Sequence, residues 1–378
     1  MIERLQKPSL KAKLAESKLL LIRGPKGTGK QSLIENILNE SNTSFCTLNC
    51  DDKKERNNIE SNGYLAQLNE TIIVLREAQH LSKLREIIED VLMGKIKHTL
   101  VVCCSYKPIV DEELIEVLEI EGMLFNVYAP SFNESATHFG LAQESELLEE
   151  RLIYGNYPAV LSDLENAEST LCQMISEIIN TQLSAKDRVN KGDKLMRMLQ
   201  LLAFNVGEPI SYNDIGERCG LDNETVERYI HLFEDAFVLI KLPTFYNDNR
   251  YELKKTHCVY FQDNGIRNAL ISNFNSTSLR NDMNDLWRNY MISERIKWIR
   301  MNNLKKKVYF WRTHTRQQMD FIEVGIDQTM AYKSDPKMIG WEKRKNVKIP
   351  KSFTEFYPNV KTSILNKTTY WNFLTRKV

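Results

Sequence analysis

The sequence lacks several patterns that are typical of well-known protein classes. Its seven cysteines form no Cys-x-x-Cys pair and its six histidines form no His-Glu-x-x-His motif, so no zinc site is visible. The longest uncharged apolar stretch, around Thr99 to Tyr106, is far too short to span a membrane. The start, Met1-Ile2-Glu3-Arg4, does not resemble a secretory signal. These absences predict buried free thiols and a cytoplasmic location with no membrane partner.

What is present is the composition of a folded, soluble chain. Hydrophobic residues make up 42% and charged residues 27% of the 378 residues, which excludes a disordered or fibrous protein. At roughly 150 residues per domain, this length predicts two or three domains. We expect three, over residues 1–140, 141–275 and 276–378. Internal repeats are absent, and an Asn-rich linker from Asn273 to Asn284 precedes the helix that is predicted from Leu286.

Charge is unevenly distributed along the chain. Residues 281–378 hold 20 Lys and Arg against 9 Asp and Glu, a net charge of +11. Because the whole chain carries +1, the remainder carries −10. A basic segment of this kind predicts an anionic partner, with DNA the most common one, or else a solvated basic surface.

In the first region, short apolar runs alternate with helical patterns. The runs lie at 19–22, 45–48, 72–75, 100–103 and 124–128, and helical spacing follows the first run and occupies 84–93. Strands that alternate with helices predict a parallel sheet with helices on both faces. The first region is therefore expected to be an α/β domain.

A glycine-rich loop follows the first predicted strand and precedes a predicted helix. Its sequence is Gly24-Pro25-Lys26-Gly27-Thr28-Gly29-Lys30. The glycines allow backbone amides to turn toward phosphate oxygens, Lys30 adds a positive charge, and the helix N-terminus faces the anion. Gly-x-x-x-x-Gly-Lys in this context is a specific signal for a P-loop, the phosphate-binding loop of nucleotide-binding proteins.

Both positions that normally hold Mg²⁺ beside a P-loop are changed. Gln31 replaces the usual Ser or Thr, and Ser32 is no substitute because one step along a helix turns a side chain by about 100°. Arg76 replaces the Asp that follows the third strand, whereas Glu77 remains to orient a water molecule. We expect Arg76 either to supply part of the missing charge near the β- and γ-phosphates or to face solvent or a carboxylate such as Glu77.

The middle region reads as a helical domain that ends in a winged helix. Ser211 starts a short helix that stops at Gly220, a second helix has one apolar face, and a strand follows at 238–240. The second helix carries few cations for phosphate contact. Two roles stay open for it, DNA reading and a protein-contact or structural role.

Taken in order, these motifs resemble a group of prokaryotic AAA-type ATPases. In that group a P-loop domain is joined to a winged helix and to an uncharacterised C-terminal domain similar to restriction nucleases. Glu77-Ala78-Gln79 is similar to the group's Asp-Glu-x-Gln element, and Ser105 stands at its polar sensor position. Further similar elements are Pro130–Glu134, Tyr154–Pro158, Thr225–Ile230 and Tyr260–Gly265.

The resemblance implies that the nucleotide is ATP. It also implies a nucleotide-sensing Arg before the fifth strand, where this chain has Met123. The residues expected at the nucleotide are the following: Gly24, Pro25, Lys26, Gly27, Thr28, Gly29, Lys30, Gln31, Ser32, Arg76 and Ser105, with Glu77 as the catalytic candidate.

The same resemblance implies a nuclease-like site in the last domain. The last domain is expected to be α/β, with a helix at 286–299 and strands at 308–311, 319–324 and 329–332. Glu294 on the helix, Asp320 on the second strand and Lys333 after the third fit the nuclease pattern, but Ala331 stands where a second carboxylate is needed. Because phosphodiester cleavage with two metal ions needs carboxylates to hold them, this change predicts a degenerate, inactive site that holds no metal.

Three functions follow from the sequence. The main one is an ATP-binding AAA-type protein whose ATPase activity is weak or lost. The alternative is a non-catalytic DNA-binding or scaffold protein that uses the degenerate nuclease-like domain. An active nuclease, the third, depends on Glu294, Asp320 and Lys333 alone.

Overall fold

A computed structural model of the chain describes residues 2–106, 110–182, 192–246, 251–253, 256–335 and 347–375. It divides the chain into two compact units, Met1–Pro130 and Ser131–Val378. The boundary lies ten residues before the one expected at 140. The further division of the second unit at 275 stays a prediction.

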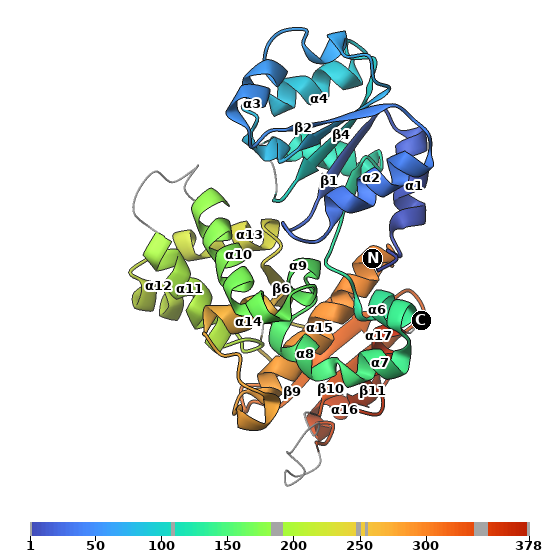
Figure 1. Cartoon of the computed structure of the whole chain (residues 1–378). Coiled ribbons are helices and arrows are strands. Elements are labelled where there is room, and N and C mark those ends of the chain that lie inside the picture. Colours follow the sequence, from blue (N-terminus) through green and yellow to red (C-terminus); the bar gives the residue numbers. More distant parts are fainter. Residues whose placement is uncertain are drawn as a thin grey trace. The chain divides into compact units, whose positions relative to one another are not determined.

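The first unit contains a parallel sheet of five strands in the order β2-β3-β4-β1-β5 (Figure 1). The parallel α/β architecture expected from the alternating runs is thereby confirmed. The last strand ends two residues earlier than expected, because its neighbour β1 turns away into the glycine-rich loop at Gly24. The strands are β1 Leu19–Arg23, β2 Phe45–Asn49, β3 Ile72–Arg76, β4 Thr99–Cys104 and β5 Leu124–Asn126.

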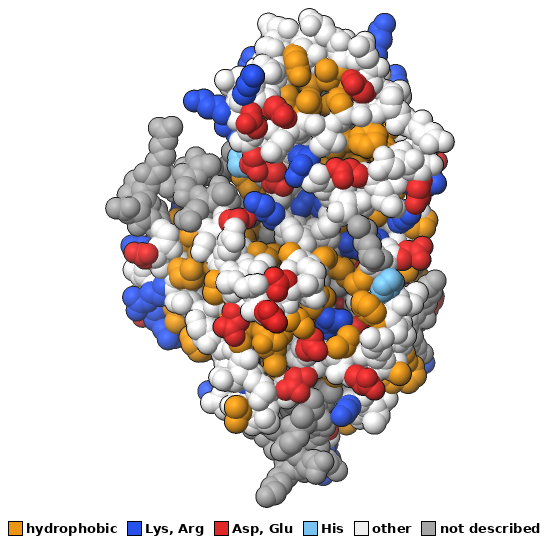
Figure 2. All heavy atoms as spheres, in the orientation of Figure 1, with side chains coloured by type: hydrophobic (Ala, Val, Ile, Leu, Met, Phe, Trp, Pro, Cys, Tyr) orange, Lys and Arg blue, Asp and Glu red, His pale blue; other side chains and the backbone are white. Residues whose placement is uncertain are grey.

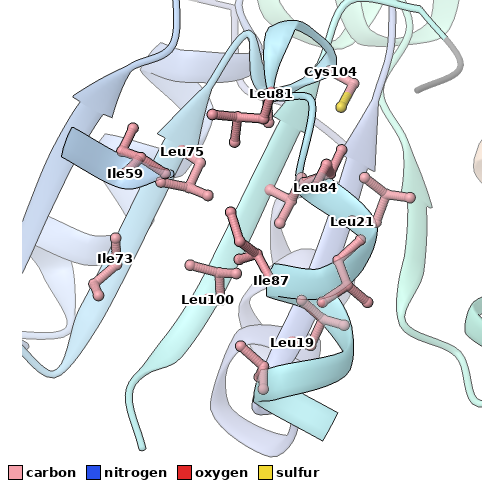
Figure 3. Close-up of a cluster of buried hydrophobic side chains, with 14 of the residues drawn as sticks. Leu19, Leu21, Ile59, Ile73, Leu75, Leu81, Leu84, Ile87, Leu100 and Cys104 are labelled. Carbon is pink, nitrogen blue, oxygen red and sulfur yellow. The ribbon is translucent and has the colours of Figure 1, made fainter. Parts of the chain in front are cut away.

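Helices cover both faces of this sheet, because side chains along each strand alternate between two apolar clusters. One face packs against α1 and α2, and the other against α3, α4 and α5. Figure 3 shows the second cluster, in which Leu84 and Ile87 of α4 meet Leu21 and Leu100 of the strands. The helices are α1 Lys7–Glu16, α2 Lys30–Glu40, α3 Lys53–Ile59, α4 Leu84–Leu92 and α5 Glu112–Ile120, with short 3-10 turns at Leu65–Gln67 and Ala78–His80.

The second unit begins with helices. Ser131 and Glu134 form a reciprocal cap at the start of α6, which gives a structural reason for the Pro130–Glu134 motif. Asp263 accepts hydrogen bonds from the amides of Asn156 and Gly265, so two of the family-like motifs bind each other. The helices are α6 Phe132–Phe139, α7 Leu141–Glu146, α8 Leu148–Tyr154, α9 Pro158–Leu161, α10 Ala167–Gln182, α11 Gly192–Phe204 and α14 Asn264–Leu270, with 3-10 turns at Leu164–Asn166 and Thr277–Leu279.

The elements expected for a winged helix occur within this unit. Helix α12 (Tyr212–Cys219) is capped by Ser211 and ends at Gly220, which has a φ of 62°. Helix α13 (Asn223–Asp235) follows, and β6 (Leu239–Pro243) pairs with β7 (His257–Phe261) in an antiparallel ribbon. The naming of this arrangement as a winged helix stays a prediction.

The rest of the unit is a four-stranded sheet in the order β11-β10-β9-β8, beside the long helix α15. Trp311 of β8 donates to Glu252 in the segment after β6, so the later parts of this unit share contacts. The elements are α15 Met283–Met301, β8 Lys307–Arg312, β9 Gln318–Val324, β10 Thr329–Ser334, α16 Lys351–Phe356, β11 Lys361–Leu365 and α17 Tyr370–Thr375.

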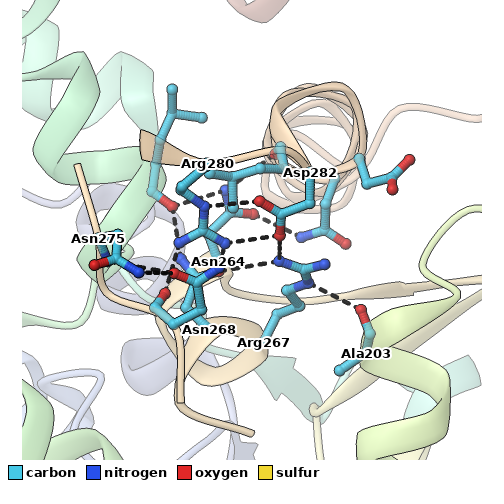
Figure 4. Close-up of polar contacts among 12 residues, drawn as sticks. Ala203, Asn264, Arg267, Asn268, Asn275, Arg280 and Asp282 are labelled. Carbon is cyan, nitrogen blue, oxygen red and sulfur yellow. Dashed lines mark hydrogen bonds and ion pairs between the residues drawn. The ribbon is translucent and has the colours of Figure 1, made fainter. Parts of the chain in front are cut away.

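A buried polar cluster fixes the segment between α14 and α15. Arg267 and Arg280 both bind the carboxylate of Asp282, and Arg280 also donates to Asn268 (Figure 4). Burial alone would raise the pKa of Asp282, but the two guanidinium groups hold it at about 2. The cluster stabilises the fold while Asp282 stays ionised.

Candidate nucleotide-binding site

The glycine-rich loop lies between β1 and α2, as its sequence predicts. A Cβ at Gly24 would lie 1.9 Å from the carbonyl oxygen of Val127, so this position admits only glycine. Gly29 has a φ of 81° and caps α2. Thr28 is fully buried and donates from Oγ1 to the Pro25 carbonyl at 2.9 Å, whereas Lys26 is exposed. The loop is therefore folded as a compact turn at the helix N-terminus.

Lys30 is the central cation of this loop. Its side chain is buried, and Nζ donates to the carbonyl oxygens of Gly24 and, at 2.8 Å, of Pro25. Ser105 Oγ lies 3.5 Å from the same Nζ. Burial lowers the pKa of Lys30, and the charge of Glu77 opposes this shift. The ammonium group is thus held by uncharged oxygens that a phosphate group can replace.

Glu77 and Ser105 lie together with Lys30, although they come from different strands. Ser105 Oγ donates to Glu77 Oε1 at 2.8 Å, and Gln79 Nε2 donates to Glu77 Oε2 at 2.7 Å. The amide of Ser105 donates back to Gln79 Oε1 at 3.2 Å, which closes the network. Glu77 has a φ of 51°, a conformation that is uncommon for a non-glycine residue.

The side chains at the two altered metal positions, Gln31 and Arg76, have different surroundings. Gln31 Nε2 donates to Glu35 Oε1 at 2.6 Å along α2, and Ser32 is exposed. Arg76 ends β3 and is half-buried. Within the described residues no ion pair joins Arg76 to Glu77, whose oxygens bind Ser105 and Gln79. A guanidinium group cannot ligate Mg²⁺, and Gln31 offers neither a hydroxyl nor a carboxylate at its position.

Of the expected nuclease-like residues, the structure brings two together and separates the third. Lys333 Nζ lies 3.1 Å from Asp320 Oδ1, and the Ser334 amide donates to Asp320 Oδ2 at 2.7 Å. The carboxylate of Glu294 instead accepts from the Phe132 amide, from Asn156 and from Lys297. Glu294 is therefore engaged in the packing of α15 against the first helices of this unit.

Arg288 takes the place near Asp320 where a carboxylate was expected. It lies on α15 six residues before Glu294, and its Nη1 is 3.7 Å from Asp320 Oδ1. Lys333 and Arg288 hold the pKa of Asp320 below its usual range, although burial opposes this shift. Ala331 is buried in an apolar cluster with Trp311. Among the described residues, no group of three metal-ligating side chains occurs.

Sequence reasoning did not assign Arg288 to the Asp320 cluster, and it gave Arg4 no role at the loop. Arg4 donates to carbonyl oxygens 24 and 124 residues away. Local patterns carry no signal for contacts of that range. The expected sensor position at Met123 lies beside β1, where its carbonyl accepts from the Leu21 amide.

Two family models match the chain. Residues 145–277 match one described as a domain of unknown function, and residues 16–136 match one described as an AAA domain. Most of the first unit therefore matches an AAA domain. An AAA-type P-loop fold implies nucleotide binding, so this part of the expectation is supported by the match and is consistent with the loop geometry.

The chain is also similar in sequence to a bacterial protein and in structure to two solved proteins. An uncharacterized protein of Haemophilus influenzae is 25% identical over an alignment of 214 residues, and the match covers 52% of this chain and 52%, about half, of that protein. A Walker-type ATPase of Pyrococcus abyssi is 12% identical over 72% of this chain and 96% of its own, with a TM-score of 0.47. The RuvB Holliday junction branch migration motor of Thermotoga maritima is 15% identical over 63% and 89%, with a TM-score of 0.33.

The described helices give one further result. None of them is long and apolar enough to cross a membrane.

Proposed function

We propose that the first unit binds ATP at residues 24–30 with little dependence on Mg²⁺, and that it hydrolyses ATP slowly or not at all. One observation carries this proposal. Lys30 is intact and held by replaceable oxygens, whereas Gln31 is bound to Glu35 and Arg76 is a cation. The phosphate-binding half of an ATPase site is thus present beside a metal-binding half that is chemically altered.

In this proposal each residue of the site has a separate role. Lys30 and the amides of the loop bind the phosphates, and Arg76 supplies part of the positive charge at the β- and γ-phosphates. Glu77 is the residual group for orienting water. Its carboxylate is occupied by Ser105 and Gln79, which favours slow hydrolysis.

Calorimetric titration of ATP, ADP and GTP into Lys30→Ala tests the binding site. Removal of the ammonium group is expected to abolish binding, whereas Lys11→Ala, which removes an exposed lysine of α1, leaves binding intact. Circular dichroism confirms that both variants are folded. Unchanged binding of ATP by Lys30→Ala contradicts the proposal.

A second candidate function, DNA binding by the C-terminal region, is favoured by its exposed charges. Among the described residues from 281 onward, two acidic side chains are exposed, those of Asp327 and Glu355. Figure 2 shows basic and acidic side chains interspersed on one face of the molecule. Eight basic residues of this region are exposed: Arg300, Lys305, Lys307, Arg316, Lys348, Lys351, Lys361 and Lys367.

We infer that any such binding is to the phosphate backbone and involves no cleavage. Asp320 is paired with Lys333 and Arg288, and Glu294 with Lys297, which leaves neither carboxylate available to hold a metal ion. Phosphate release from ATP with Mg²⁺, with and without DNA, separates a DNA-stimulated ATPase from a scaffold. Supercoiled plasmid should remain uncut, and DNA affinity should fall steeply with salt.

For the predicted winged helix we propose a protein-contact or structural role. The exposed side of α13 carries Glu224 and Glu227 beside Arg228. Two carboxylates beside one guanidinium group disfavour contact with DNA phosphates.

A further inference from the structure

The segment before α1 reaches the glycine-rich loop. Arg4 is buried, with an exposed fraction of 7%, and its Nη1 donates to the Thr28 carbonyl at 2.9 Å. Its Nη2 donates to the Tyr128 carbonyl, just after β5. Gln6, also buried, donates to the Asn126 carbonyl at 2.8 Å. Residues 4–6 therefore connect the loop to the end of the neighbouring strand.

The placement of buried polar groups in the first unit is selective. Among its described residues, the buried charged side chains are Arg4 and Lys30, and both contact the glycine-rich loop. A buried cation costs free energy unless its donors are hydrogen-bonded, and both of these cations donate to loop carbonyls. Arg4 thus belongs to the same site as Lys30, although it lies 26 positions earlier in the chain.

Peptide geometry explains what the contact at Thr28 does. A trans peptide is planar, and its C=O and N–H point in opposite directions. No cis peptide bond occurs among the described residues. When Arg4 holds the Thr28 carbonyl on one side, the amide of Gly29 is held toward the other. Because Gly29 has a φ of 81° and little conformational preference of its own, an external contact is needed to fix this direction.

The second contact extends this effect to the start of the loop. Tyr128 follows Val127, whose carbonyl closely approaches Gly24. One guanidinium group thus links the middle of the loop to the chain segment that packs against its first glycine. Arg offers two donors in a fixed planar fork that can reach carbonyls on separate segments, whereas Lys offers its donors from a single nitrogen atom.

We propose that Arg4 is a positioning residue for phosphate binding, which holds the amides of residues 24–30 in the orientation that receives a nucleotide. This inference rests on the proposed ATP-binding function. It assigns a role to the N-terminal segment, and it predicts that loss of Arg4 affects the phosphates of the ligand and not its base.

The test compares Arg4→Ala, Arg4→Lys and Lys13→Ala by titration with ATP and with adenosine. Lys13 is the matched control, because its ammonium group also donates from the N-terminal segment to a backbone carbonyl, that of Gly122, away from the loop. Arg4→Ala should bind ATP about tenfold more weakly, with adenosine affinity unchanged. Arg4→Lys should recover only part of this loss, and millimolar guanidinium should restore ATP binding to Arg4→Ala.

Each other outcome overturns the inference. If Arg4→Ala binds ATP as the wild type does, or if Lys13→Ala loses as much affinity, Arg4 acts only on the fold. If ATP and adenosine weaken equally, the effect does not lie at the phosphates. Failure of the proposed function is distinguishable, because the wild type and Lys30→Ala would then bind ATP alike, and both proposals would fall.

Discussion

The two units of this protein use ionic groups in different ways. In the first unit, several ion pairs join exposed or half-exposed side chains, such as Lys7 with Glu40 and Lys95 with Asp90. In the second unit, several pairs are buried, such as Arg151 with Glu144 and Arg295 with Glu323. The buried cations of the first unit, Arg4 and Lys30, donate to carbonyl oxygens of the loop. In our proposal, buried charge serves a ligand site in the first unit, whereas in the second unit it stabilises the fold.

The contrast is clearest between Lys30 and Asp320, which occupy the places where the sequence predicts chemistry. Lys30 keeps its charge available for an anion. The negative charge of Asp320 is instead balanced by the positive charges of Lys333 and Arg288, which disfavours its use as a metal ligand. A buried ion pair contributes little net stability, but removal of one partner is costly because the other is left unpaired.

The largest predicted effect is on the second unit. Asp320→Ala leaves Lys333 and Arg288 without this partner and should lower the free energy of unfolding by about 3 kcal/mol. Urea unfolding followed by tryptophan fluorescence measures this change, because all five tryptophans lie after residue 280. Asp327→Ala, at an exposed turn, should change stability by less than about 0.5 kcal/mol. If the two variants were equally stable, the claim that buried ionic groups stabilise the second unit would be contradicted.

A smaller effect is predicted for acid. The pKa of Asp282 is held at about 2, below its ordinary value, so the stabilisation is complete above the ordinary aspartate pKa and disappears as pH falls toward 2. Asp282→Asn should therefore lose more stability relative to wild type at pH 7 than at pH 2, with the gap narrowing by roughly 2 kcal/mol. Denaturant unfolding at both pH values gives this gap. A gap that does not change with pH would show that Asp282 is not held in its ionised form.

The smallest predicted effect concerns the altered metal positions. The double variant Gln31→Ser, Arg76→Asp restores a hydroxyl and a carboxylate, so Mg²⁺ should tighten ATP binding and raise phosphate release about tenfold. The control, Gln31→Ala with Arg76→Ala, removes the same native groups without adding ligands. If both double variants release phosphate equally, the altered positions do not limit hydrolysis.

Much of the first unit could be predicted because its signals are local. Apolar runs between turns set the strands, and the glycines of residues 24–30 set the loop. The proximity of Glu77, Ser105 and Lys30 could also be expected, because parallel strands bring their carboxyl ends to one edge of the sheet. The contacts of Arg4 with Thr28 and Tyr128 could not be predicted, because they depend on how the chain folds back onto residues far along the sequence.

The Asp320 site shows where local reasoning stops. The sequence identified the helix that carries Glu294 and the two strands that carry Asp320 and Lys333. It could not show which turn of that helix contacts the strands. Arg288 and Glu294 are six residues apart, which corresponds to about 9 Å along the helix axis. Arg288 lies at Asp320, and Glu294 binds Asn156 and Lys297.

One titration tests the central claim most directly. ATP is titrated calorimetrically into the wild-type protein, once with Mg²⁺ and once with EDTA. If Lys30, the loop amides and Arg76 bind the phosphates without a metal ion, the two affinities should agree within about threefold. A collapse of affinity when EDTA removes the metal would contradict the account.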